Sequence, residues 1–126
     1  MPSIQRRPVT TKAAPPPAGA YSQGVISNGF LFISGQGPFD ENGNKCPASF
    51  SEEAHLAFKN LQSVAAAAGA ELSNAVRVGV YLDDMANFVE LSEIMREYFR
   101  EPLPARTTIP VALNGFQIEV DVIVAM

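Results

Sequence analysis

Alternating apolar and polar positions mark two stretches of the chain as β-strands with one buried face. Residues 76–82 and 116–125 both place an aliphatic side chain at every second position. These positions are Val76, Val78, Val80 and Leu82 in the first stretch, and Ile118, Val120, Val122 and Val124 in the second. Because the side chains of a strand point alternately to its two faces, these residues are predicted to face the core. Glu119 and Asp121 are predicted to face away from it.

Two other stretches have the spacing of an amphipathic helix. Between residues 54 and 68 apolar side chains recur every three or four positions, and Ser49 with Glu52 gives the capping-box pattern just before them. Gly69 is a suitable C-terminal cap. A second helix is predicted after Asn87, because Asn87 and Glu90 together can cap its N-terminus. Prolines at 102 and 104 would end this helix. Its apolar face would comprise Phe88, Leu91, Met95 and Tyr98.

Asn-Gly pairs predict the turns of two β-hairpins. Asn28-Gly29 separates residues 22–27 from an apolar run at 30–35, and Asn114-Gly115 separates residues 106–112 from 116–125. In the second hairpin the strand of Glu119 would pair with the strand of Arg106. The predicted order of elements is ββαβαββ.

This order predicts an α/β (α+β) fold, in which one mixed sheet carries both helices on the same face. No segment is left to cover the other face, and an uncovered, semi-polar sheet face favours oligomerisation. A length of 126 residues suits one domain. Residues 1–18, which include three consecutive prolines, are predicted to be a flexible or extended N-terminal segment, and residues 19–126 a single domain.

Charge and composition narrow the choice of partner and compartment. The net charge is −4 and the basic residues are scattered, which argues against nucleic acid. The single cysteine excludes an internal disulfide and, with no signal-peptide pattern, predicts a cytoplasmic protein. No apolar run approaches the roughly 20 residues that span a bilayer, so no membrane partner is expected. Residues 1–14 carry basic side chains and no acid, as a polar tail or a remnant of organelle targeting would.

Residues for metal or nucleophilic catalysis are missing from the sequence. His55 is the one histidine, and its position early in the first predicted helix is that of an ordinary surface residue. Cys46 lies in a polar loop without a basic neighbour and is interpreted as incidental. No cluster has zinc-ligand spacing, no triad can be built around His55, and no glycine-rich nucleotide motif occurs. We therefore expect neither a metal nor a cofactor.

Arg106 and Glu119 are the candidates that remain. Arg106 follows Pro104-Ala105, and prolines that stiffen a loop fix the direction of the guanidinium, whose planar fork of donors suits a carboxylate. A partly buried Glu119 beside a cleft could orient water or move protons. For both residues an ordinary ion pair is the alternative. Gly35, at the end of an apolar strand, permits close approach of a ligand to the backbone or simply a tight turn.

Six short motifs carry a resemblance to a known family, through their order and spacing between Pro16 and Val124. They are Ala20-Tyr21-Ser22-Gln23, Ser34-Gly35-Gln36 with Pro38, Asn60-Leu61, Ala68-Gly69, Pro104-Ala105-Arg106-Thr107 and Ile118-Glu119-Val120. In these motifs the sequence resembles the RidA (YjgF) family of reactive-intermediate deaminases, whose members are also labelled endoribonuclease L-PSP.

The resemblance implies a chorismate-mutase-like subunit, assembled as a homotrimer with sites at the subunit interfaces. It implies hydrolysis of enamines and imines of the 2-aminoacrylate type to 2-keto acids and ammonia, without a cofactor. Arg106 would bind the carboxylate of a small 2-imino or 2-keto acid, and Glu119 would position or activate water. The same pocket would be lined by Tyr21, Ser34, Gly35, Ser92 and Thr108, the last two replacing the family's asparagine and cysteine.

Two other functions stay open on the sequence alone. A non-catalytic or regulatory trimer that binds small carboxylates would need Arg106 but not Glu119. A ribonuclease or translation inhibitor is the other, and the acidic charge and the lack of paired histidines argue against it. Deamination fits the residues best, because a reactive enamine needs only anchoring, a placed water and a proton carrier.

Overall fold

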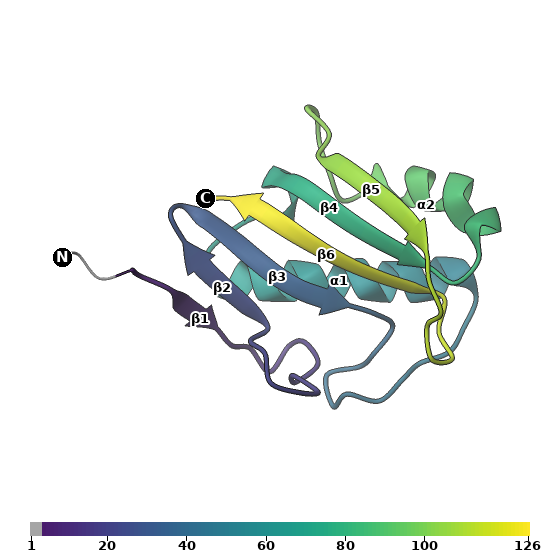
Figure 1. Cartoon of the computed structure of the whole chain (residues 1–126), viewed down its shortest axis with the longest axis horizontal. Helices are drawn as coiled ribbons and strands as arrows, with labels where there is room; N and C mark the ends of the chain where they lie inside the picture. Colours follow the sequence, from purple (N-terminus) through teal and green to yellow (C-terminus); the bar gives the residue numbers. More distant parts are fainter. Residues whose placement is uncertain (1–3) are drawn as a thin grey trace.

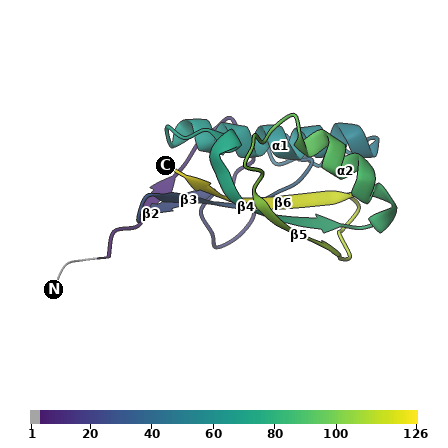
Figure 2. The same cartoon turned by 90° about the horizontal axis from the view of Figure 1, so that it is seen from above.

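The computed structural model describes residues 4–126. These residues form one mixed sheet, and two helices cover one of its faces. Within these residues the strands follow the spatial order β1-β2-β3-β6-β4-β5 (Figure 1). The strands are β1 (Arg7–Val9), β2 (Gly24–Ser27), β3 (Phe30–Gln36), β4 (Ala75–Leu82), β5 (Ala105–Pro110) and β6 (Ile118–Ala125); the helices are α1 (Phe50–Ala67) and α2 (Phe88–Met95), with short 3-10 turns η1 (Leu72–Asn74) and η2 (Met85–Asn87). Figure 2 shows both helices on the same side of the sheet, which confirms the predicted α+β class.

The first predicted hairpin is confirmed. β2 and β3 pair antiparallel across Asn28-Gly29, and both turn residues have positive φ, at 54° and 79°. Two such residues in a row make the tight turn whose twist matches the flanking strands, and asparagine followed by glycine is the pair that tolerates it best.

The second predicted hairpin is wrong, because β5 and β6 do not pair. β5 lies at the edge of the sheet, parallel to β4, and β6 lies between β3 and β4, antiparallel to both. The crossover through α2 returns the chain parallel to β4, and Pro110, which lacks an N–H donor, suits the edge. β6 buries every second side chain and occupies the centre, where both of its edges find partners.

The core lies between the helices and the alternate aliphatic residues of β4 and β6, as their pattern predicted, with one exception. The register of β4 against β6 shifts between Ala75 and Arg77, so that Ala75 is buried in the core. Val76, predicted to face the core, is 43% exposed. A bulge inserts one unpaired residue and so reverses the alternation beyond it.

Helix α1 begins and ends as its sequence predicted. The Ser49 hydroxyl accepts a bond from the backbone N–H of Glu52 at 3.2 Å and donates one to the Glu52 carboxylate at 2.9 Å. At the other end Gly69 has φ +73°, and the N–H of Ala70 donates to the carbonyl of Ala65 at 2.9 Å. This is the Schellman arrangement, in which a left-handed glycine closes the helix.

The predicted start of α2 is wrong in its capping residue. Asn87 makes no capping hydrogen bond, whereas the carboxylate of Asp84 accepts from the N–H of Ala86 at 2.9 Å and caps the η2 turn that leads into α2. The helix also ends at Met95, before the prolines that were expected to stop it. A 3-10 turn placed ahead of the helix moves the unsatisfied N–H groups three residues upstream.

Part of the segment 1–18 is extended and joins the domain. Arg7–Val9 form β1, which pairs antiparallel with β2, and Val9 and Ala14 are buried in the core. Residues 1–3 lie outside the described part, and the predicted division at residue 18 stays a prediction.

Replacing Ser49 by Ala should lower the free energy of unfolding by about 1 kcal/mol, because the N–H of Glu52 loses its acceptor. Chemical denaturation measures this, with Ser51→Ala in the first turn of α1 as the control. An equal effect of the two substitutions would contradict the capping role of Ser49.

Candidate functional site

The face of the sheet opposite the helices carries two neighbouring carboxyl groups, on Glu119 and Asp121 of β6. Cross-strand partners in a sheet point to the same side, and here Tyr81 of β4 pairs with Glu119 and Gly79 with Asp121. The Tyr81 hydroxyl donates a 2.8 Å hydrogen bond to the Asp121 carboxylate. Tyr81 therefore holds Asp121, and Glu119 stays free to meet a ligand.

The pKa values of Glu119 and Tyr81 are both raised above their ordinary values. Burial raises the pKa of Glu119, and the neighbouring charge of Asp121 raises it further. The hydrogen bond to Asp121, followed by burial, raises the pKa of Tyr81. A carboxyl whose pKa moves up towards neutrality is better matched to carrying protons than an ordinary surface glutamate.

Gly35 makes room for Glu119. A β-carbon at residue 35 would lie 2.8 Å from Oε2 of Glu119 and 2.9 Å from its carboxyl carbon, closer than real atoms come. The backbone of Gly35 is thus approached closely, as its sequence position suggested, but by the Glu119 carboxylate. Any larger residue at position 35 would push that carboxylate aside.

An open cavity of about 730 Å³ lies over this part of the sheet. Four of the predicted site residues line it together: Tyr21, Ser34, Gly35 and Glu119. The hydroxyl of Ser34 donates to the carbonyl of Ser22 at 2.6 Å, and the hydroxyl of Tyr21 accepts from the N–H of Ala18 at 2.9 Å. These bonds tie the loop before β2 to the end of β3 and fix the rim of the cavity.

Arg106 lies elsewhere, on the helix-facing side of β5, where its partner in register is the buried Val78. Its Nη1 donates to the Ser92 hydroxyl at 3.0 Å, and its guanidinium carbon lies 4.9 Å from the centre of the Phe88 ring. A cavity of about 380 Å³ opens here between α2 and the loop before β5. Ser92 and Phe88 together aim the guanidinium without neutralising it.

Neither Arg106 nor Glu119 forms an ion pair with another of the described residues. Over residues 4–126 the one ion pair within 4.0 Å joins His55 and Glu97. The ion-pair alternatives for Arg106 and Glu119 are therefore wrong within this part of the chain, and Arg77 instead donates to the hydroxyl of Thr107 at 2.8 Å. A charged donor fork and a charged carboxylate without partners are typical of groups that meet a ligand.

Thr108 shares the helix-facing side of β5 with Arg106, where it pairs in register with Val80. Its hydroxyl is buried, and no hydrogen-bond partner for it occurs in the described structure. Thr108 does not belong to the residues that line the Arg106 cavity. Of the two predicted replacements, Ser92 therefore contacts Arg106 directly and Thr108 lies beside it.

The chain does not bring Arg106 and Glu119 together. The register puts Arg106 on the helix-facing side and Glu119 on the open side, and β4 lies between their two strands. A small acid cannot touch both groups of this chain, since the sheet separates them. The two clusters are therefore separate in this structure.

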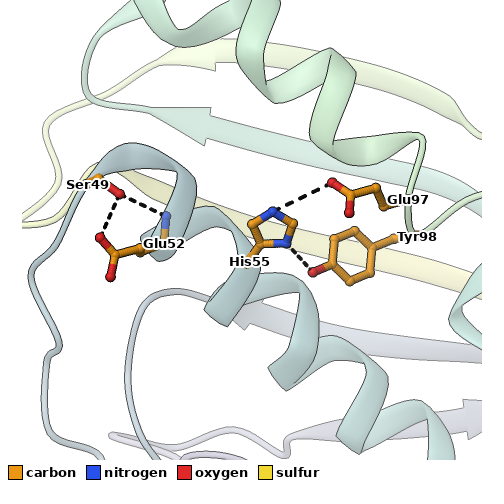
Figure 3. A network of polar contacts seen from close by, with 5 residues as sticks. All are labelled: Ser49, Glu52, His55, Glu97 and Tyr98. Atoms are coloured by element: carbon orange, nitrogen blue, oxygen red, sulfur yellow. Dashed lines mark hydrogen bonds and ion pairs between the residues drawn. The ribbon is translucent and has the colours of Figure 1, made fainter.

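The single histidine belongs to the helical layer. Nδ1 of His55 lies 2.5 Å from the Tyr98 hydroxyl, and Nε2 lies 3.6 Å from the Glu97 carboxylate (Figure 3). Tyr98 also stacks on Phe58, at 4.8 Å between ring centres, and burial raises its pKa. This network fastens α1 to the segment after α2, on the side of the sheet opposite Glu119.

Within residues 4–126, no group of three or more His, Cys, Asp or Glu side chains is placed to hold a metal ion. No helix in this range is long and apolar enough to cross a membrane.

Comparison with known proteins gives consistent matches. The family model described as Endoribonuclease L-PSP matches residues 11–126. A rat protein named 2-iminobutanoate/2-iminopropanoate deaminase is 39% identical over 98% of this chain and 92% of its own length. The mitochondrial protein MMF1 of Saccharomyces cerevisiae is 36% identical over 90% of this chain and 79% of its own length. Since that name gives a mitochondrial location, the cytoplasmic location of this chain stays a prediction.

Solved structures agree in fold over nearly the whole chain. The crystal structure of yeast Mmf1 is 36% identical and superposes with a TM-score of 0.89, covering 96% of this chain and 98% of that one. The structure of RidA from an Antarctic Psychrobacter is 33% identical, with a TM-score of 0.89, and covers 95% of this chain and 99% of that one.

Replacing Asp121 by Asn should lower the pKa of Glu119 towards its ordinary value, because one of the two causes of its elevation is removed. A carbon-13 NMR titration of the side-chain carboxyl measures it, with Glu71→Gln, a surface change, as the control. If the two variants titrate alike, burial alone sets the pKa of Glu119.

Proposed function

We propose, on the premise that this chain belongs to the endoribonuclease L-PSP family, also called the RidA family, that it hydrolyses 2-imino acids to 2-keto acids and ammonia. Enamines of the 2-aminoacrylate type would enter as their imine tautomers. The proposal includes the finer assignment of Glu119 as proton carrier and Arg106 as carboxylate anchor.

The observation that carries the proposal is the environment of Glu119. Its carboxyl group is half-buried, has a raised pKa and faces an open cavity. It occupies the space over Gly35 that a side chain at position 35 would otherwise fill. A carboxyl group in such a position can take a proton from an attacking water molecule and give it up again, and a raised pKa favours this role. A group with only a structural role would not need an empty cavity in front of it.

The chemistry needs no further group. Glu119 takes a proton from a water molecule as the water oxygen bonds to C2 of the imine, and passes that proton to the imine nitrogen, which gives a carbinolamine. The carboxylate then takes the hydroxyl proton of the carbinolamine and delivers it to the nitrogen. The C2–O double bond of the keto group forms as the C2–N bond breaks with its electron pair leaving on ammonia. Holding water and substrate together supplies most of the acceleration such a reactive imine requires.

Arg106 is suited to bind the carboxylate group of the substrate. Its guanidinium has no carboxylate partner within the described residues and is aimed by Ser92 and Phe88. Two parallel N–H donors match a carboxylate, and this charge-assisted contact would fix the acid in one orientation.

Since Arg106 and Glu119 lie on opposite sides of one sheet, we propose that each complete site uses Arg106 of one subunit and Glu119 of the next. A cyclic homotrimer, as the resemblance implied, repeats that contact three times and closes. The open sheet face supports this assembly, because Phe30 and Phe32 on β3 are 39% and 44% exposed, and both helices lie on the other side of the sheet (Figure 2).

Glu119→Gln tests the proton carrier, because it keeps the shape of the side chain and removes its basicity. With 2-iminopropanoate generated by an amino-acid oxidase acting on alanine, turnover should fall on the order of 100-fold. The activity of the unchanged protein should rise as pH increases through the raised pKa of Glu119, since only the ionised carboxylate accepts a proton.

That rise should be missing from the pH profile of the Gln variant. Unchanged turnover in Glu119→Gln would refute Glu119 as the proton carrier. No hydrolysis by the unchanged protein, with pyruvate still bound, would support a non-catalytic carboxylate-binding protein instead.

Arg106→Ala should weaken binding of the substrate carboxylate by about 10- to 150-fold, which is what a charge-assisted hydrogen bond contributes. Arg106→Lys should restore little, because it lacks the planar fork. Initial rates across imine concentrations separate this loss from a loss of turnover.

Mixing the two single variants tests the shared site. Refolding equal amounts of Arg106→Ala and Glu119→Gln together should recover about a quarter of wild-type activity per subunit, because random assembly pairs an intact Arg106 with an intact Glu119 at one interface in four. Each variant refolded alone is the control. No recovery, with mixed assemblies demonstrated by mass spectrometry, would mean that the site lies within one subunit.

A further inference from the structure

A second, smaller cavity adjoins Glu119. It measures about 210 Å³ and shares Tyr21, Gly35 and Glu119 with the open cavity over the sheet. Besides the amide side chains of Gln23 and Gln36, its remaining walls are mainly apolar, made by the proline segment before β2 and by two aromatic rings. The wall residues that matter are Pro15, Pro16, Phe39 and Phe116.

The size and lining of this cavity suit one substituent of a ligand. Sites that hold a whole small molecule usually measure about 300–1,000 Å³, so 210 Å³ is room for a part of one. Phe39 and Phe116 meet edge to face, with ring centres 5.2 Å apart and an angle of 78° between the rings. Rings packed against each other in this way are held in place and present an apolar surface.

Buried polar side chains fix each wall of the cavity. Gln23 is buried and clamps the proline segment, accepting from the N–H of Thr11 at 2.7 Å and donating to the carbonyls of Thr11 at 3.0 Å and Pro15 at 2.9 Å. Asn60 of α1 is also buried and donates to the carbonyls of Gly37 at 3.1 Å and Phe39 at 2.9 Å.

The wall that carries Phe116 is fixed in the same way. The buried carboxylate of Glu53 accepts from the backbone N–H of Gln117 at 2.9 Å and from its side-chain amide at 2.7 Å. Lys45 donates to the carbonyl of Asn114 at 2.8 Å and so joins the Phe39 loop to the Phe116 loop.

The buried polar side chains of the described residues are Gln23, Gln36, Glu53 and Asn60, and all four belong to this region: Gln36 lines the cavity and the others hold its walls. Burying a polar group is unfavourable unless its hydrogen bonds are made, so their concentration at one cavity indicates a rigid, preformed shape. A preformed apolar recess next to the reacting group is the geometry of a specificity pocket.

We propose that this cavity is a subsite for the side chain of the 2-imino acid, with Phe39 and Phe116 as its specificity-determining residues and Gln23, Glu53 and Asn60 as positioning residues. The proposal rests on the proposed function. With C2 at Glu119 and the carboxylate towards Arg106 of a neighbouring subunit, the substituent on C2 enters the recess. The favoured substrates are imines with an apolar side chain of leucine size, ahead of those with a methyl group or a charged group.

The test compares kcat/KM for imines generated in place by oxidases from alanine, leucine and glutamate. The leucine-derived imine should exceed the alanine-derived one by about tenfold, as expected for a few additional apolar contacts, and the glutamate-derived imine should be the poorest. Phe116→Ala should lower the leucine-to-alanine ratio by about tenfold. Ile4→Ala, which removes an apolar side chain that is 85% exposed and lines neither cavity, is the control and should keep the wild-type ratio.

A ratio of rates is insensitive to the fraction of correctly folded protein, and Phe116→Leu, which keeps an apolar side chain, should give an intermediate ratio. Hydrolysis of all three imines with the ratio unchanged in Phe116→Ala would overturn the subsite and leave the deaminase function intact. A preference for the alanine-derived imine would overturn it too. Failure to hydrolyse any of them would instead refute the proposed function.

Discussion

The central position of β6 is the constraint on which the rest of the structure depends. β6 pairs on both edges, with β3 and β4, and its aliphatic residues Val120 and Val122 are buried beneath the helices. Because a strand alternates strictly, burial of these residues forces Glu119 and Asp121 to the opposite side. A shift of one residue would bury both carboxyl groups, so the hydrophobic core itself guarantees where they point.

The sheet that orders these groups also keeps the guanidinium from the carboxyl. Arg106 belongs to the edge strand and is aimed by α2, whereas Glu119 belongs to the central strand and is aimed by the core and by the free space over Gly35. Each group is positioned by its own part of the fold. In the proposed assembly, contacts between subunits would bring the two clusters together.

Local sequence patterns predicted the parts of the structure that depend on interactions between residues close in sequence. The capping of α1 by Ser49, the Gly69 termination and the turn at Asn28-Gly29 each depend on residues a few positions apart, and all were predictable. The pairing of β6 with β4 depends on the long crossover through α2, and the bulge at Val76 depends on a partner strand far along the sequence. Neither the strand pairing nor the bulge can be recognised from about ten consecutive residues of sequence.

The candidate residues could be named from the sequence, but their arrangement could not. Arg106 and Glu119 were identifiable from their chemical type, from the adjacent proline and from strand alternation, yet their placement on opposite sides of the sheet follows from the strand order, which the assumed hairpin misjudged. Gln23 and Asn60 belonged to recognisable motifs without a discernible role. Their function became visible only with the burial of their amides, because a sequence does not reveal which polar side chains leave water.

The bonds made by Gln23 and Asn60 have a consequence for how this fold can diversify. Every partner of the two side-chain amides is a backbone N–H or carbonyl: those of Thr11, Ala14 and Pro15 for Gln23, and those of Gly37 and Phe39 for Asn60. Main-chain groups are present whatever side chain a position carries. The positions held in this way can therefore change identity over evolutionary time while the frame around them keeps its shape, so that new linings can arise without a new fold.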